Sequence, residues 1–118
     1  MPQLIFKILT AAEWQSAESA GVFDGVGIDR ADGYIHFSTG TQVEETAAKH
    51  FAGQAGLVLV AIDAAALGAA LKWEVSRGGA LFPHLYGTLS PRDARWVRPL
   101  PLGPDGRHVF PPEPAPGP

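Results

Sequence analysis

The chain has 118 residues, a formal net charge of −3, no cysteine, and 46% hydrophobic against 18% charged residues. This composition is typical of one globular domain, and it excludes disulfides, thiolate catalysis and cysteine-ligated metal centres. The slightly acidic balance is the opposite of what a generic nucleic-acid-binding protein needs, and no apolar run is long enough to span a bilayer. The first seven residues lack the pattern of a signal peptide, so we expect a cytoplasmic protein.

Proline divides the chain into two parts. Eight of the 11 prolines fall between Pro99 and Pro118. Because proline has no backbone donor and resists the interior of helices and sheets, this stretch favours an extended conformation. The sequence therefore predicts a globular domain over residues 1–102 and a proline- and glycine-rich tail, extended or disordered, over residues 103–118.

The first elements follow from local patterns. The apolar run at residues 4–9 predicts a strand. Thr10 and Glu13 have the spacing of a capping box, which predicts a helix over residues 11–20. Residues 21–33 are rich in glycine and aspartate, which is typical of a loop.

The middle of the chain continues the alternation of strands and helices. Residues 34–37 predict a second strand, and a second helix begins within residues 39–44 and ends near Gly53. The run at residues 57–62 has no polar face, so it predicts a strand that is covered on both sides. Asp63 then caps a short turn.

The last elements complete the predicted fold. Residues 71–75 alternate as a strand, whereas residues 81–87 predict irregular structure or an edge strand, because Pro83 cannot donate to a central ladder. A helical turn at residues 90–93 and a strand at residues 96–100 follow. Together these elements predict a single compact α+β domain, with a mixed or split sheet and two main flanking helices.

One candidate site lies where the second strand meets the second helix. Tyr34, His36 and Ser38 share one face of the strand, and the apolar residues between them face the core. Ser38 and Thr39 precede the free N–H groups of a helix start, which favour an anionic ligand such as a phosphate. The alternative is that His36 is a core histidine, and that the two hydroxyl residues only cap the helix.

A second candidate site lies within residues 73–87. Glu74, Arg77, His84 and Tyr86 supply a carboxylate, a guanidinium, an imidazole and a phenol, and Gly78 allows close approach of a ligand. These groups can form a polar pocket. The alternative is that Glu74 and Arg77 form a surface ion pair and that His84 is an ordinary turn residue.

Two further features are open to more than one interpretation. The Lys7 ammonium either reaches the edge of its apolar strand or points into a pocket and meets a phosphate. His36, His84 and Glu74 are acceptable metal ligands, but their spacing matches no compact metal motif, so we predict no metal site. We expect His50 to be incidental.

Several stretches resemble a bacterial family catalogued as domain of unknown function 952. They are residues 5–8, residues 34–39 with Gln42, Trp73 with Glu74, and residues 78–87. The resemblance covers roughly residues 3–100. It implies an ADP-ribosyltransferase-like fold, which is a split sheet with flanking helices that holds NAD in a cleft.

The resemblance also implies roles for particular side chains. Lys7 stands where that fold grips the dinucleotide, and the strand with His36 and Ser38 stands where it positions the nicotinamide ribose. Glu74 is the counterpart of the glutamate that orients the ribose and the incoming nucleophile, and His84 could replace it.

We therefore expect an enzyme that binds NAD or an ADP-ribose-like nucleotide, a small phosphorylated ligand, and acts as a transferase or glycohydrolase. The expected catalytic residues are Glu74, His36 and His84, and the expected ligand-binding residues are Lys7, Ser38, Thr39, Arg77, Gly78 and Tyr86. One alternative is a non-enzymatic module that binds a small anion or metabolite, and another is an interaction protein that docks through its proline-rich tail. The sequence makes no prediction of the oligomeric state.

Overall fold

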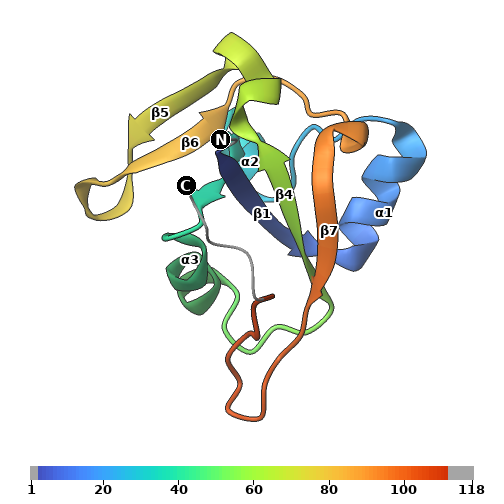
Figure 1. Cartoon of the computed structure of the whole chain (residues 1–118), viewed down its shortest axis with the longest axis vertical. Coiled ribbons are helices and arrows are strands. Elements are labelled where there is room, and N and C mark those ends of the chain that lie inside the picture. Colours follow the sequence, from blue (N-terminus) through green and yellow to red (C-terminus); the bar gives the residue numbers. More distant parts are fainter. Residues whose placement is uncertain (1–2, 112–118) are drawn as a thin grey trace.

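In the computed structural model, which describes residues 3–111, the chain folds into two antiparallel sheets with helices packed around them (Figure 1). The strands are β1 (Leu4–Thr10), β2 (Ile35–His36), β3 (Ser38–Thr39), β4 (Leu57–Asp63), β5 (Leu71–Val75), β6 (Leu81–Leu85) and β7 (Ala94–Leu100). The α-helices are α1 (Ala11–Ala20), α2 (Ile28–Asp32) and α3 (Val43–His50), and short 3₁₀ helices span Ala64–Ala70, Arg77–Gly79 and Pro91–Asp93. The sheets have the strand orders β3-β1-β4-β7 and β2-β6-β5.

The junction between β1 and α1 is set by local hydrogen bonds, as predicted. Thr10 Oγ1 accepts from the backbone N–H of Glu13 at 3.0 Å, and Glu13 Oε1 accepts from the backbone N–H of Thr10 at 2.9 Å. The helix ends at Gly21, whose φ of 78° is favourable for glycine. It buries Trp14, whose indole N–H has no hydrogen-bond partner among the described residues.

The four-stranded sheet separates two apolar clusters. Alternate side chains of β1 and β4 enter opposite clusters, so that Ile5 packs with α1 and Phe6 packs with α3. The prediction that residues 57–62 are covered on both sides is confirmed, because nearly all of β4 is buried. The two longer helices therefore lie on opposite faces of this sheet (Figure 1).

The segment at residues 21–33 differs from the predicted loop, because it contains the helix α2. Gly27 precedes the helix, and Gly33 ends it with a left-handed φ of 85°. Glycine at these positions starts and stops a short helix rather than breaking one. The glycines do mark places where the chain turns, as the sequence predicts. The sequence analysis did not predict the helix that lies between Gly27 and Gly33.

One segment belongs to both sheets. The predicted strand at residues 34–37 is observed as β2, and after Phe37 the chain continues directly as β3 in the other sheet. The Phe37 N–H donates to the carbonyl of Pro83 in β6 at 3.0 Å. Beyond this hydrogen bond the chain crosses from the three-stranded sheet to the four-stranded sheet. This crossing holds the two sheets next to each other.

The prediction for Pro83 is wrong, because β6 is the central strand of its sheet. In a strand, the N–H and C=O of one residue point to the same side. The Pro83 carbonyl faces Phe37, so the missing N–H also falls there, where the ladder between β2 and β6 ends. Proline costs little at this point, although the strand is central.

The observed architecture confirms a small α+β domain with antiparallel sheets. All strand pairs between the described residues are antiparallel, so of the two predicted forms, a mixed or a split sheet, the split one is observed. Helices α1 and α3 are the two main helices. No described helix has the length and apolar character needed to cross a membrane.

The predicted tail is described only in part. Leu102 and His108 form an antiparallel bridge, and the Val109 N–H donates to the carbonyl of Pro101 at 2.8 Å. Phe110 packs against the apolar cluster on the α3 side of the sheet. Residues 103–111 thus fold back onto the domain, while residues 112–118 lie outside the described residues. The division of the chain after residue 102 stays a prediction.

The capping box gives a first test. Thr10→Ala removes the oxygen that accepts from Glu13 N–H, so we expect a loss of about 1 kcal/mol in the free energy of unfolding, measured by urea denaturation. Thr41→Ala is the control, because Thr41 is exposed and makes no cap to α3, and its effect should stay within about 0.5 kcal/mol. Equal losses for both variants would contradict the capping role of Thr10.

Candidate functional site

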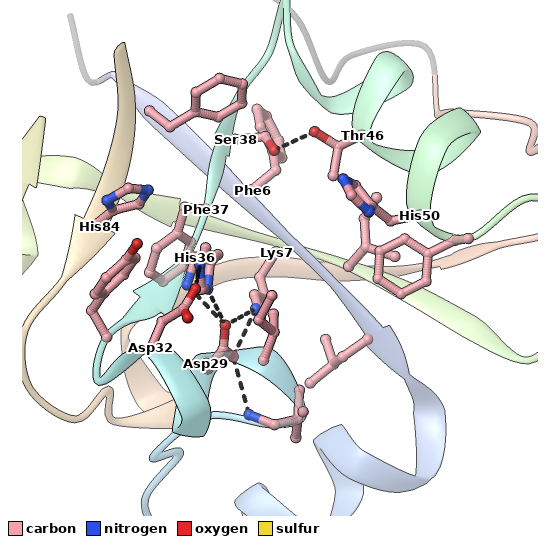
Figure 2. Close-up of a pocket in the computed structure, with 18 of the residues that line it drawn as sticks. Phe6, Lys7, Asp29, Asp32, His36, Phe37, Ser38, Thr46, His50 and His84 are labelled. Carbon is pink, nitrogen blue, oxygen red and sulfur yellow. Dashed lines mark hydrogen bonds and ion pairs between the residues drawn. The ribbon is translucent and has the colours of Figure 1, made fainter. Parts of the chain in front are cut away.

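A cavity of about 520 Å³ lies where β1, α2, β2, α3 and β6 meet (Figure 2). Its volume is in the range of small-molecule sites. The walls are largely apolar and include Phe6, Phe37 and Phe82, and the polar groups gather at the end formed by α2, β2 and β6. The site is best described from this polar end.

Asp29 is the centre of the polar end. Its carboxylate is 2.8 Å from Lys7 Nζ, and it accepts from the backbone N–H groups of Val26 and His36, each at 3.0 Å. Gly25 lies against it so closely that a Cβ there would be 2.8 Å from Asp29 Cβ. Figure 2 shows Lys7 and His36 pointing to this carboxylate from different elements.

The Asp29–Lys7 pair is buried. Burial alone would raise the pKa of Asp29, but the hydrogen bond from His36 and the charge of Lys7 lower it to about 2. Burial also lowers the pKa of Lys7, and the charge of Asp29 only partly offsets this. The Lys7 ammonium is thus paired inside the protein. It is not free to bind a phosphate, which was one of the two roles that the sequence left open for it.

His36 bridges two carboxylates. Its Nδ1 is 2.7 Å from Asp29 Oδ1, and its Nε2 is 3.0 Å from Asp32 Oδ2. Ionised carboxylates only accept hydrogen bonds, so both contacts are satisfied when the ring carries both protons. His36 is therefore held between the two carboxylates at the polar end of the cavity.

A second histidine has a different arrangement. His84 Nδ1 is 2.7 Å from Glu74 Oε1, and the Tyr86 hydroxyl donates to the same oxygen at 2.8 Å. These two hydrogen bonds lower the pKa of Glu74, and the bond to Glu74 raises the pKa of Tyr86 to about 12. Because the ionised Glu74 must accept, His84 donates from Nδ1, and in the neutral ring the lone pair is then on Nε2.

Aromatic contacts bring the two histidines together. The Tyr34 ring is stacked on His84, with ring centres 4.2 Å apart, and it lies 4.6 Å from His36 and 5.0 Å from Tyr86. The centres of the two imidazoles are 5.4 Å apart. Burial, Asp32 and Glu74 all raise the pKa of Tyr34, so the phenol stays neutral. One side chain thus holds both histidines in fixed positions.

The α3 side of the cavity is held by hydroxyl groups. Ser38 Oγ lies 2.8 Å from Thr46 Oγ1, which donates to the carbonyl of Gln42 at 3.1 Å. Ser38 therefore joins β3 to α3 rather than capping the helix. His50, which we expected to be incidental, lines this side of the cavity.

The predicted site residues separate into three groups. Those that line the cavity are His36, His84, Lys7 and Ser38. Those that lie outside the lining are Glu74, Thr39, Gly78 and Tyr86, although Glu74 and Tyr86 are bonded to the site through the Glu74 carboxylate. The Arg77 side chain is outside the described part of the structure. The predicted grouping of Glu74, His84 and Tyr86 is therefore observed as direct contacts.

Two acidic residues at the polar end of the site were missed, and Glu13, predicted only as part of the capping box, also lines the cavity. Asp29 and Asp32 lie three positions apart on α2, a spacing that places both on one face of a helix. That pattern could have been recognised if Gly27 and Gly33 had been interpreted as helix ends. The same region holds no metal cluster: among residues 3–111, no three histidine, aspartate or glutamate side chains are grouped as metal ligands.

Comparison with known proteins assigns the family. Residues 8–97 match the model for "Protein of unknown function (DUF952)". The chain belongs to this family. Comparison with curated proteins gave no match.

Solved structures of a relative share the fold. The crystal structure of CC0527 from Caulobacter crescentus is 53% identical, covers 90% of this chain and 93% of its own, and superposes with a TM-score of 0.87. The solution NMR structure of CC0527 is 54% identical, covers 88% and 90%, and has a TM-score of 0.80. These structures support the α+β fold, but they give no support to the ADP-ribosyltransferase-like assignment.

The buried carboxylate gives a test at the site. The pKa of Asp29 is about 2 in the folded chain against an ordinary value of 3.8, so its stabilising effect is present above that value and is lost as the pH falls toward 2. Asp29→Asn should cost about 3 kcal/mol near neutral pH, because it leaves Lys7 buried without its partner. This cost should shrink by about 2 kcal/mol between about pH 5 and pH 2.

Urea denaturation of both proteins across this pH range measures the effect. Asp24→Asn is the matched control, because Asp24 is exposed and pairs only with the exposed Arg30. A cost of Asp29→Asn that does not change with pH would show that the Asp29 charge does not stabilise the fold.

Proposed function

We propose that the cavity binds the ribosyl-pyridinium end of a nicotinamide nucleotide such as NAD, and that the domain acts as a glycohydrolase or transferase at the glycosidic bond. The observation that carries this proposal is the charge of the cavity. Its described lining includes three carboxylates, Glu13, Asp29 and Asp32, and one amine, Lys7. With His36 counted as a cation and His50 and His84 counted as neutral, the acidic groups are in excess by one.

This charge excess selects which part of a nucleotide the cavity accepts. A pyridinium ring is cationic, so negative surroundings stabilise it, whereas a diphosphate placed in the same cavity would be repelled. The phosphates of the ligand would therefore lie outside the cavity. Lys7 is not available to bind them, and the ligand-binding role expected for Arg77 stays a prediction.

The walls of the cavity are suited to a flat ring attached to a sugar. Phenylalanine side chains supply apolar surface for a planar group, and the polar end supplies imidazoles and carboxylates for ribose hydroxyls. The resemblance to the family of unknown function 952 led us to expect a split sheet with flanking helices that holds NAD in a cleft. That expectation suggests the ligand class, but only the residues of the site can support a reaction.

His84 is suited to act as the general base. Glu74 holds its Nδ1–H, so Nε2 can take a proton from water or from an acceptor hydroxyl. The oxygen bonds to the anomeric carbon, the bond from that carbon to the pyridinium nitrogen breaks, and its electron pair leaves with neutral nicotinamide. The positive charge that develops on the ribose is stabilised by the nearby carboxylates.

Thermal melts test the binding step. A ligand at about 100 times its dissociation constant stabilises a domain by about 2.7 kcal/mol, which raises the Tm by several degrees. We expect such a shift with NAD and with nicotinamide riboside, and a smaller one with ADP-ribose, which lacks the cation. An equal or larger shift with ADP-ribose alone would contradict the proposed orientation.

Release of nicotinamide from NAD tests the chemical step. His84→Ala removes the base, and its rate should fall by at least about 100-fold while NAD binding persists. Glu74→Gln should lower the rate by a smaller factor, since it only changes how His84 is held. Lys49→Ala, on the exposed surface of α3, is the control. Binding without any release of nicotinamide would favour the non-enzymatic module instead.

A further inference from the structure

Strand β5 forms a free edge of the three-stranded sheet. The strand order β2-β6-β5 places it outermost, and Figure 1 shows the β5–β6 hairpin projecting from the body of the domain. Its five residues pair with β6 in unbroken register and include no proline. Natural edge strands are usually protected against pairing by bulges, prolines or a covering segment, and β5 has no bulge or proline.

The backbone direction shows which groups the edge presents. The Pro83 carbonyl faces β2, so the alternate residues Phe82 and His84 face β5, opposite Glu74 and Lys72. The remaining residues of β5 therefore direct their N–H and C=O groups away from the sheet. At Leu71 the N–H bonds to the Gly68 carbonyl, so this residue offers only its carbonyl at the edge.

The side chains beside this edge are apolar and exposed. The exposed fractions are 38% for Trp73, 69% for Val75 and 51% for Leu81. Val75 and Leu81 are cross-strand partners, so these three side chains share one face of the hairpin. We call this surface the edge patch. On the opposite face of β5 lie Lys72 and Glu74, which carry opposite charges.

The sequence of β5 is complementary to itself. If a second copy pairs antiparallel about a twofold axis at Trp73, each Lys72 lies opposite the partner's Glu74, and each Leu71 lies opposite the partner's Val75. The outward backbone groups match this register. Each Trp73 N–H meets the partner's Trp73 carbonyl, and each Val75 N–H meets the partner's Leu71 carbonyl.

We propose that β5 is a self-association edge, at which two copies of the chain join their three-stranded sheets into one continuous antiparallel sheet. Two observations favour a second copy over a foreign strand. The charges of this one strand complement themselves in the register that also satisfies its backbone. Glu74 uses Oε1 for His84 and Tyr86, and among the described residues no hydrogen bond is made to Oε2, which can accept from the partner's Lys72.

Charge exchange tests the register. In Lys72→Glu, two glutamates face each other across the axis, and in Glu74→Lys two lysines do, so each variant alone should dimerise on the order of tenfold more weakly. Mixed in equal amounts, the two variants restore both opposite-charge pairs. We expect sedimentation equilibrium to show a wild-type dimer, weakened dimers of each variant, and a heterodimer in the mixture.

Two further variants complete the design. Lys49→Glu makes the same charge change on α3, away from the edge, and should leave the dissociation constant unchanged. Val75→Pro removes an outward N–H without touching the ladder to β6, and it should weaken the dimer with no change of charge. Thermal melts of each variant verify folding. A monomeric wild type, a mixture that does not associate, or a Val75→Pro variant that dimerises normally would overturn the proposal.

Discussion

The whole site depends on one buried carboxylate. Asp29 binds the Lys7 ammonium of β1, the His36 ring and backbone of β2, and the Val26 N–H ahead of its own helix. Strand β1, whose Lys7 is 22 residues away along the chain, is thus held at the same point as α2 and β2. The Gly25 backbone fits against this carboxylate because it has no side chain. Removing the Asp29 charge would leave the buried Lys7 ammonium unpaired. The same substitution would therefore disturb both the polar end of the cavity and the packing of β1 against α2.

Much of the fold could be predicted because its causes are local. Thr10 and Glu13 cap α1, and they are only three residues apart in the sequence. The unbroken apolar run of β4 is enough to predict that this strand is buried on both faces. Pro83 was misjudged for a reason that is not local. Whether a proline suits a central strand depends on which side its missing N–H faces, and the β2–β6 pairing decides that. The residues next to Pro83 in the sequence do not show which side of the strand pairs with β2.

The site was predicted in the same uneven way. Glu74 and His84 lie on neighbouring strands, and their residue types alone suggested the contact that is observed. The partner of Lys7 is 22 residues away along the chain, on a helix that was not recognised, so the sequence left its role open. As a result the expected phosphate-binding lysine is a buried structural cation, and the acidic excess of the cavity changes which part of a nucleotide it would attract.

The segment that crosses between the sheets also limits how the chain can vary in length. Residues 34–39 serve as an edge strand of both sheets in one unbroken stretch. Inserting or deleting one residue there would exchange the two faces, turning the buried Ile35 toward the cavity and His36 into the core. The turns at residues 76–80 and 103–107 carry no such constraint, because each only closes a hairpin. Insertions and deletions among DUF952 proteins should therefore accumulate at those turns and spare the crossing.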